Sequence, residues 1–206
     1  PAGYMSGEWW SGLEKRTETP GVAAWPIANH PRERVDWDEA VAFGRWLTAR
    51  LRAAGMLGSA AEARLPTEEE WERAARGTEG REYPWGDGYR SGQANINETW
   101  EHAKVSELNL GRTSAVGPYA DGATPAPEGV QDLAGNVWEW CLDWHEEDFL
   151  GGAARVVRGG SWYDDPRGAR ASCRYRNHPV NRGSGFGFRL VISSPNSPVP
   201  LAAGAA

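Results

Sequence analysis

Residues 129–140 read GVQDLAGNVWEW, a stretch in which a loop changes into a strand. Its Gly and Asp residues are typical of an ordered loop, and VWEW alternates apolar and polar side chains as a half-buried strand does. The same alternation recurs in RVVRGGSW (155–162) and FGFRLVI (186–192). The second half of the chain is therefore predicted to consist of short strands joined by long ordered loops.

Two helices are predicted before this region. The first lies within residues 35–55, where apolar side chains recur every three or four positions. Asp36 starts it with a capping box that a Glu three residues later closes. The second lies within residues 64–77, where Thr67 starts an equivalent box. Helices early in the chain and short strands later favour an α+β fold.

The composition indicates a loop-rich globular protein of one large domain or two small ones. Its 206 residues include 26 Gly, 14 Pro and 12 Trp, which predicts many loops and aromatic packing. The net charge of -6 argues against nucleic acid as a partner of the whole surface. No run of about 18 apolar residues is present, so no membrane span is expected. We expect a soluble protein; its compartment is not predicted, and surface display or association with a phage is left open.

Six motifs, in the same order, resemble the formylglycine-generating-enzyme (sulfatase-modifying factor) domain family. The resemblance implies a C-type lectin fold of the formylglycine-generating-enzyme type. This is an α+β fold with two helices, small twisted antiparallel sheets and long ordered loops. The domain covers residues 35–191, after an irregular N-terminal part (1–34) and before a loose C-terminal tail (192–206). The motifs are RLPTEEEWERAARG, YPWGD, ANIN, GVQDLAGNVWEW, RVVRGGSW and GFRLV.

The resemblance also allows the family's metal chemistry to be tested on the residues. The family's oxidases bind copper through two thiols five residues apart, and the matching positions here hold Pro166 and Ala171. Cys173 has no thiol nearby in the sequence, and whether it pairs with Cys141 is left open. The family's sulfoxide synthases need iron held by three histidines, whereas the four His here form no H-x-x-x-H pair.

We therefore expect neither copper nor iron and predict that the chain is not an enzyme. The alternative is an oxygen-dependent metalloenzyme, of the formylglycine-generating or sulfoxide-synthase type, with missing parts upstream.

A structural calcium ion is a further expectation from the resemblance. The motifs ANI and GNVWEW resemble family segments that hold Ca²⁺, which makes Asn95, Asn136 and Glu139 the candidate metal ligands. Carboxamide and carboxylate oxygens are hard ligands of the kind that Ca²⁺ prefers. The alternative is that these side chains only hydrogen-bond the loop backbone.

The segment between RVVRGGSW and GFRLV, residues 163–186, contains no Lys, Glu, Gln, Met or Trp. Some family members are variable proteins of diversity-generating retroelements, in which the adenines of AAC or AAT codons are mutated in this segment. Such codons cannot reach those five residue types. The resemblance thus implies a non-catalytic ligand-binding protein with a hypervariable C-terminal surface. The alternative within the same fold is an invariant accessory recognition domain.

Positions in this segment that fall between the family's motif residues are the candidate ligand-binding surface. Tyr, Ser, Asn and Asp are typical of natural paratopes, which combine rigid aromatic side chains with adaptable polar ones. Six Arg against two Asp in residues 163–189 give a local charge of +4. This favours a protein or an acidic glycan as the unknown ligand over nucleic acid. The nine candidates are Tyr163, Asp164, Asp165, Arg167, Tyr175, Asn177, His178, Ser184 and Phe186.

Eight other positions in and after the segment match the family frame and are expected to act as scaffold. Their arginines are expected to hydrogen-bond loop carbonyls and carboxylates. These positions are Pro166, Arg170, Arg174, Pro179, Arg182, Gly187, Phe188 and Arg189.

Overall fold

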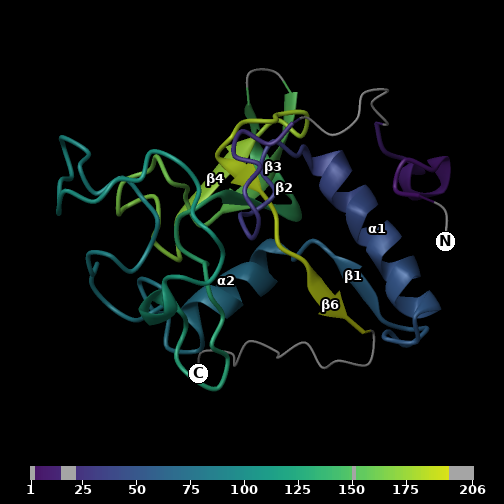
Figure 1. Cartoon of the computed structure of the whole chain (residues 1–206), viewed down its shortest axis with the longest axis horizontal. Helices are drawn as coiled ribbons and strands as arrows, with labels where there is room; N and C mark the ends of the chain where they lie inside the picture. The colour runs from purple at the N-terminus through teal and green to yellow at the C-terminus, as the bar shows by residue number, and fades with distance from the viewer. Residues whose placement is uncertain (1–2, 15–21, 150–151, 195–206) are drawn as a thin grey trace.

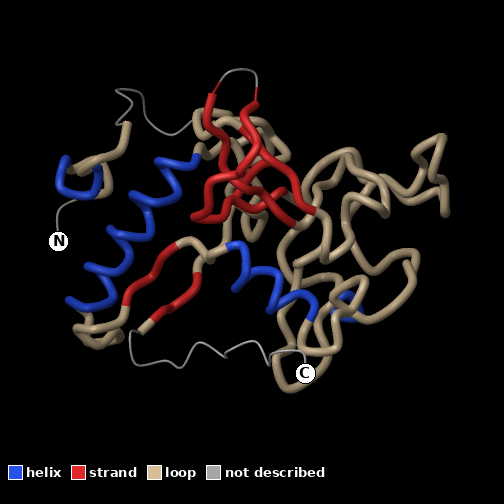
Figure 2. Tube along the Cα trace, turned by 180° about the vertical axis from the view of Figure 1, so that it is seen from behind, coloured by secondary structure: helices blue, strands red, loops and turns tan. Residues whose placement is uncertain are grey.

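The computed structural model of the chain describes residues 3–14, 22–149 and 152–194 (Figure 1). The helices, where η marks a 3-10 helix, are η1 Gly7–Trp10, α1 Trp37–Ala53, α2 Glu68–Arg76 and η2 Ala120–Gly122. The strands are β1 Glu62–Arg64, β2 Trp138–Phe149, β3 Gly152–Arg158, β4 Arg174–Asn177, β5 Phe186–Gly187 and β6 Val191–Ser193. Long loops make up most of the side of the molecule away from α1 (Figure 2). The expected α+β architecture is confirmed.

Both predicted helices are confirmed, and each begins with its capping box. At the start of α1, the side chain of Asp36 accepts from the N–H of Glu39, and the Glu39 carboxylate accepts from the N–H of Asp36, both at 2.9 Å. At the start of α2, Thr67 and Glu70 make the equivalent pair at 3.1 and 2.8 Å. α1 ends just before Gly55, whose φ of 70° is left-handed.

Two sheets are present in the described part of the chain. β1 and β6 form an antiparallel pair, and the other four strands lie in the order β4-β3-β2-β5. The pairs β2–β3 and β3–β4 are antiparallel as expected, but β5 runs parallel to β2, with Trp138 opposite Phe186. β4 is antiparallel to β3, so it runs in the same direction as β2. The loop from β4 to β5 passes to the other edge of the sheet, and β5 runs in this same direction, parallel to β2.

The two ends of the domain differ in detail from the expected boundaries. The irregular N-terminal part contains the short helix η1, and its residues 1–2 and 15–21 lie outside the described residues. β6 extends to Ser193 and pairs with β1, so the first two residues of the expected tail belong to a strand. Residues 195–206 of the tail lie outside the described residues.

Tryptophan side chains form the centre of the core, and their indole N–H groups find buried acceptors. Trp140 on β2 is fully buried and donates to the carbonyl of Val35 at 2.9 Å. Trp37, the first residue of α1, donates to the carbonyl of Cys141 at 2.9 Å. Phe186 stacks on Trp140 with ring centroids 5.8 Å apart. The start of α1, β2 and β5 are thereby joined in one core.

The two cysteines do not form a disulfide. Cys141 lies in a buried cluster with Trp71 and Leu133, whereas Cys173 packs against the cluster around Trp140. Burial raises the pKa of both thiols, which keeps them protonated and unreactive near neutral pH.

A close contact between α1 and β1 depends on a glycine. Gly44 faces the backbone of β1, and a Cβ at this position would lie 2.9 Å from the carbonyl oxygen of Ala63. Real Cβ atoms essentially never approach a backbone oxygen so closely. The helix can therefore pack directly on the strand only because position 44 has no side chain.

A buried carboxylate orders the loop of residues 89–108. Glu98 accepts hydrogen bonds from the hydroxyls of Tyr89, Ser91 and Ser106 and from the N–H of Gly92. Burial acts to raise the pKa of Glu98, but these four donors stabilise the carboxylate more, so its pKa lies below the ordinary value. The loop is thus held from inside by an ionised group.

The Gly44→Ala variant is expected to be less stable than the wild type by about 1–3 kcal/mol, because the added methyl group overpacks the α1–β1 contact. The gain in helix propensity, at most about 1 kcal/mol, acts in the opposite direction. Urea unfolding measures the difference. Gly58→Ala is the control, since its Cβ would meet nothing within 4 Å and its stability should change by less than about 0.5 kcal/mol. A Gly44→Ala variant as stable as the wild type would contradict the close contact.

The Glu98→Gln variant is expected to lose about 1–3 kcal/mol of stability at neutral pH, because an amide accepts fewer hydrogen bonds and leaves donors unpaired. The folded pKa of Glu98 lies below its unfolded value. Its carboxylate therefore adds stability above the unfolded pKa of about 4.3, and this stability is lost as pH falls through the folded pKa. Denaturant unfolding of both proteins over a pH series should show a stability gap that narrows under acid conditions. Glu101→Gln, an exposed change in the same loop, should show no such gap.

Candidate functional site

A buried guanidinium fixes segment 163–186 to the rest of the molecule. Arg158, at the end of β3, is 1% exposed and donates to the carbonyls of Ala171 at 2.9 Å and Ser172 at 3.3 Å. Its second amino group also pairs with the carboxylate of Glu72 on α2 at 2.7 Å. Arg158 therefore joins β3, α2 and the segment at one point.

The carbonyls of two frame prolines bind other elements. The hydroxyl of Tyr83 donates to the carbonyl of Pro166 at 3.1 Å. The backbone N–H of Trp37 donates to the carbonyl of Pro179 at 2.9 Å. These bonds tie one end of the segment to the YPWGD motif and the other end to the start of α1.

Two frame arginines of the segment pair with carboxylates from an earlier part of the chain. The Nε of Arg174, on β4, lies 2.8 Å from the carboxylate of Glu68 at the start of α2. The Nε of Arg170 lies 3.0 Å from the carboxylate of Glu82. The expectation that frame arginines bind carboxylates is confirmed at both positions.

The remaining frame arginines bind the core. Arg182 pairs with Asp36 at 3.0 Å and with Glu39 at 2.7 Å, so it contacts both members of the α1 capping box. Arg189 donates to both carboxylate oxygens of Glu139 on β2, at 2.5 and 2.7 Å. Arg182 and Arg189 therefore hold the two sides of the loop that leads into and out of β5.

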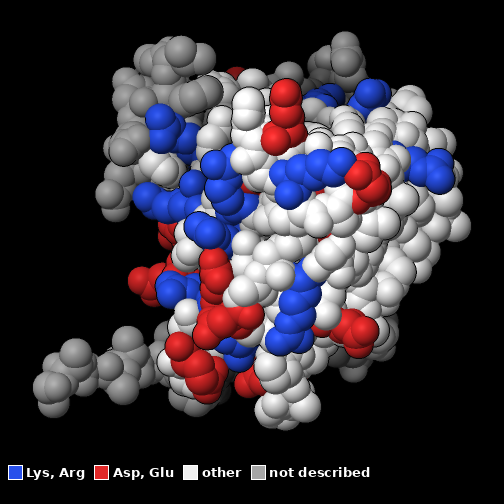
Figure 3. All heavy atoms as spheres, turned by 90° about the vertical axis from the view of Figure 1, so that its left-hand side faces the viewer, with Lys and Arg blue, Asp and Glu red and all other residues white. Residues whose placement is uncertain are grey.

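The expected +4 charge of this region is cancelled in the folded chain. Among the described contacts, Arg170, Arg174, Arg182 and Arg189 each pair with a carboxylate from outside the segment, and Arg167 pairs with Asp165 inside it. The carboxylates from outside the segment belong to α1 and its N-cap, α2, β2 and a loop. The charge of +4 was summed over residues 163–189 alone, so it left these carboxylates out. On the face shown in Figure 3, acidic and basic side chains lie next to one another and wide areas carry neither.

The nine candidate ligand-binding residues differ in exposure. Three are exposed: Arg167, Tyr175 and His178. The exposed fraction of Tyr175 is 51%. Four are partly buried: Tyr163, Asp164, Asp165 and Ser184. The structure buries the other two, Asn177 and Phe186, which corrects the expectation that all nine are exposed.

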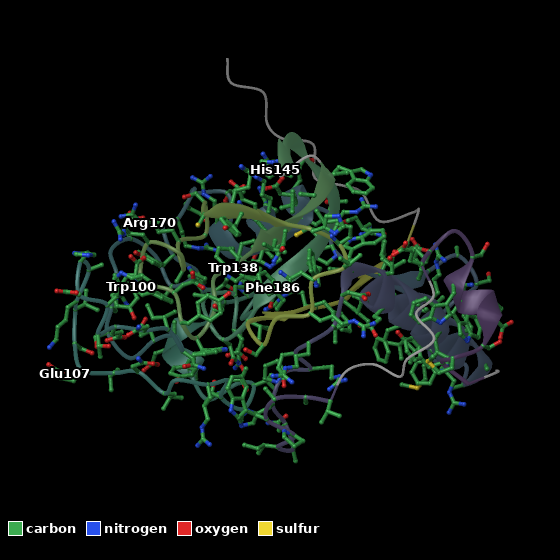
Figure 4. All side chains as sticks on the ribbon, turned by 90° about the horizontal axis from the view of Figure 1, so that it is seen from above. Trp100, Glu107, Trp138, His145, Arg170 and Phe186 are labelled. Carbon is green, nitrogen blue, oxygen red and sulfur yellow. The ribbon has the colours of Figure 1, made fainter. Side chains whose placement is uncertain are left out.

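The two buried candidates have structural partners. Phe186 pairs with Trp138 across β2 and β5 and belongs to the main core. The side-chain oxygen of Asn177 accepts from the N–H of His178 at 2.9 Å and from the side-chain amide of Asn181 at 3.0 Å. Figure 4 shows Trp138 and Phe186 in the interior and Arg170 at the loop end of the molecule. Both candidates therefore shape the turn and the core rather than a surface.

Four exposed residues of the segment were not among the candidates: Arg170, Ser172, Arg174 and Val180. Val180 is 36% exposed, and the side chain of Arg170 is 46% exposed although it matches the family frame. Val180 lies outside the matched frame positions and two residues from His178, so the same criterion could have included it. The exposed set is therefore Arg167, Arg170, Ser172, Arg174, Tyr175, His178 and Val180.

Aromatic and polar contacts beneath the exposed set make it rigid. Tyr175 rests against Trp138, with ring centroids 5.6 Å apart. Asp164 accepts from the N–H and the hydroxyl of Ser161 at 3.0 and 2.5 Å, and its carbonyl accepts from the N–H of Asn97 at 2.8 Å. Burial raises the pKa of Asp164 above its ordinary value. The half-buried candidates thus support the surface from below.

The three expected calcium ligands do not come together as one set. Asn95 donates to the side-chain oxygen of Asn136 at 3.2 Å, and that oxygen also accepts from the N–H of Ser114 at 3.0 Å. Glu139 instead binds Arg189 and the indole N–H of Trp71. Of these three side chains, Asn95 alone has a buried oxygen without a described hydrogen-bond partner. These side chains do not fit a shared calcium ion in this arrangement, so calcium stays an expectation from the resemblance.

The positions that match the copper-binding thiols carry buried hydrocarbon side chains, Pro166 and Ala171. Within the described residues, no group of three or more His, Cys, Asp or Glu is placed to hold a metal ion. In the same part of the chain, no helix is long and apolar enough to cross a membrane.

The chain is similar to several proteins of known name. It is 35% identical over 183 residues to the formylglycine-generating enzyme of Streptomyces coelicolor, covering 79% of this chain and 52% of that protein. It is 33% identical to hercynine oxygenase of Mycobacterium tuberculosis, covering 92% of this chain and 43% of that protein. It is 31% identical to inactive C-alpha-formylglycine-generating enzyme 2 of Mus musculus, covering 90% and 58%. The chain thus spans about half the length of these relatives.

Two solved structures are similar in fold. Treponema denticola variable protein 1 matches with a TM-score of 0.60 and 25% identity, covering 85% of this chain and 76% of that one. CarF matches with a TM-score of 0.63 and 26% identity, covering 82% and 69%.

These comparisons correct one prediction. The expectation that the chain is not an enzyme is contradicted, because relatives over most of its length are named as enzymes, a formylglycine-generating enzyme and an oxygenase, beside others named inactive. The model of the sulfatase-modifying factor enzyme 1-like domain matches residues 3–194, which includes the irregular N-terminal part. The chain belongs to the sulfatase-modifying factor enzyme 1-like domain family.

Proposed function

We propose that this chain binds a ligand through the surface of segment 163–186, and that a diversity-generating retroelement varies this surface. One observation carries the proposal: the segment is divided into fixed and exposed positions. Its frame residues are tied to α1, α2 and the core, while Arg167, Tyr175, His178 and Val180 are exposed between them. A surface of this design can change its side chains without changing its backbone.

The likeness to Treponema denticola variable protein 1 supports the proposal, because that protein is named as variable and shares the fold over most of both chains. The absence of Lys, Glu, Gln, Met and Trp from residues 163–186 supports it independently, since these are the types that adenine mutation of AAC or AAT codons cannot produce. The first argument rests on similarity of structure and the second on which amino acids the codons can encode, so the two are independent.

The ligand we propose is a protein rather than an acidic glycan or a nucleic acid. The paired arginines remove the excess positive charge that would attract a polyanion. What remains exposed is a tyrosine on a tryptophan support, with His178 and Val180 nearby in the chain. A rigid aromatic side chain with small polar and apolar neighbours is typical of surfaces that bind proteins.

Deep sequencing of this locus from one growing population tests the diversification. We expect substitutions to concentrate in the codons of the exposed positions of segment 163–186, at sites where a nearby near-repeat carries adenine. Codons 35–160 should stay constant in the same reads and serve as the internal control. A segment as constant as the rest of the gene, without a neighbouring template or reverse transcriptase, would contradict the proposal and favour an invariant recognition domain.

Two displayed libraries test the division of the segment into fixed and exposed positions. The first randomises Arg167, Tyr175, His178 and Val180, and most of its members are expected to stay folded because surface changes cost about 0.5 kcal/mol or less each. The second randomises four buried positions, Ala169, Ala171, Asn177 and Phe186, and most of its members should unfold. Protease resistance of the displayed proteins measures the folded fraction. Equal survival of the two libraries would contradict the proposed division.

A further inference from the structure

A pocket of about 370 Å³ lies between α1 and β1, which run side by side in Figure 1. The contact of Gly44 with the backbone of β1 brings these elements together next to it. On α1, residues 41, 45, 48 and 52 line the pocket, a spacing that places their side chains on one face of a helix. The pocket is separate from the exposed positions of segment 163–186, none of which lines it.

One part of the pocket is apolar. Val41 and Leu142 face it as partly buried side chains, and Ala63 and Leu65 are buried. Thr48, at the middle of the helix face, already uses its hydroxyl on the backbone of Ala63, accepting from the N–H at 2.8 Å. The lining therefore offers an aliphatic surface to a ligand, with the one hydroxyl engaged elsewhere.

The other part carries positive charge without a paired carboxylate. Arg45 donates to the carbonyls of Trp9 and Ser11 at 3.1 and 2.8 Å, and Arg52 donates to the carbonyl of Ala61 at 2.8 Å. Within the described residues neither guanidinium has an ion-pair partner. Carbonyl oxygens orient a guanidinium but do not neutralise its charge. Arg45 and Arg52 thus hold two oriented charges at the pocket.

A third arginine and a glutamate complete the charged lining. Arg64 is neutralised by Glu70, at 2.7 Å, and it also lies 3.5 Å from Glu62. Glu62 is half-exposed and is the carboxylate that an anionic ligand would have to avoid. Since Glu70 already neutralises Arg64, Glu62 offsets one of the two charges on Arg45 and Arg52, and the lining keeps one net positive charge.

We propose that this pocket binds a small amphipathic carboxylate, such as a medium-chain fatty acid. Its aliphatic chain lies along Val41 and Leu142, the two partly exposed apolar side chains of the lining, and its carboxylate accepts hydrogen bonds from Arg45 and Arg52. A guanidinium presents its donors in a fork that matches a carboxylate, and both arginines have donors that their backbone carbonyls leave unused. The proposal is independent of the ligand surface on segment 163–186.

Isothermal titration calorimetry of the full chain with octanoate tests this proposal, with 1-octanol as the matched probe that lacks the charge. We expect octanoate to bind at one site and at least about tenfold more tightly than octanol, with an affinity that falls as salt concentration rises. Octanoate that binds no more tightly than octanol to the wild-type chain would overturn the proposal, whatever the variants show.

Variants locate the site. Arg52→Gln is expected to weaken octanoate binding by about tenfold or more and to leave octanol binding unchanged. Arg45→Gln should act in the same direction, but Arg45 also holds the backbone near η1, so its thermal unfolding is measured alongside. Arg90→Gln removes the same charge from an exposed loop position and should have no effect. Octanoate binding that is equal in the wild type and Arg52→Gln would place the ligand elsewhere and overturn the assignment.

Discussion

The buried guanidinium of Arg158 is the interaction on which the arrangement of the loops depends. It reaches from the end of β3 to the carbonyls of Ala171 and Ser172 and to the carboxylate of Glu72. A charge that is 1% exposed is tolerable only while these partners remain, and removal of one partner of such a pair typically costs about 3–5 kcal/mol. Segment 163–186 has little regular structure of its own, so this anchor decides where it lies against the sheet and α2.

The sequence predicts those features whose causes lie within a few residues. The capping boxes at Asp36 and Thr67 are local patterns, and both helices begin where these patterns place them. The partners of the arginines are different, because Arg174 and Glu68 are 106 positions apart and no periodicity links them. The charge of the segment was therefore overestimated. The burial of Phe186 could not be predicted from nearby residues either. It depends on the parallel pairing of Phe186 with Trp138, which is distant in the sequence.

The family indicates which positions are frame but not how the free positions divide. Tyr175 and Asn177 lie on the same short strand, yet one is half-exposed and the other is buried under a turn. Residues two apart on a strand share one face, so the alternation of side chains does not separate them. The turn after β4 does, because Asn181 and His178 bind the side chain of Asn177. Because the chain is similar both to proteins named as enzymes and to a protein named as variable, its fold alone does not decide its function.

The position of β4 at the edge of the four-stranded sheet limits which side chains its surface can carry. An edge strand exposes backbone donors and acceptors that can pair with another chain, and natural proteins discourage this with charged residues. Arg174 and Arg176 on either side of Tyr175 are charges of this kind. If random replacement put aliphatic residues at neighbouring positions of β4, the strand would become an aggregation site. Such variants would then be lost through aggregation before they could be selected for binding a ligand.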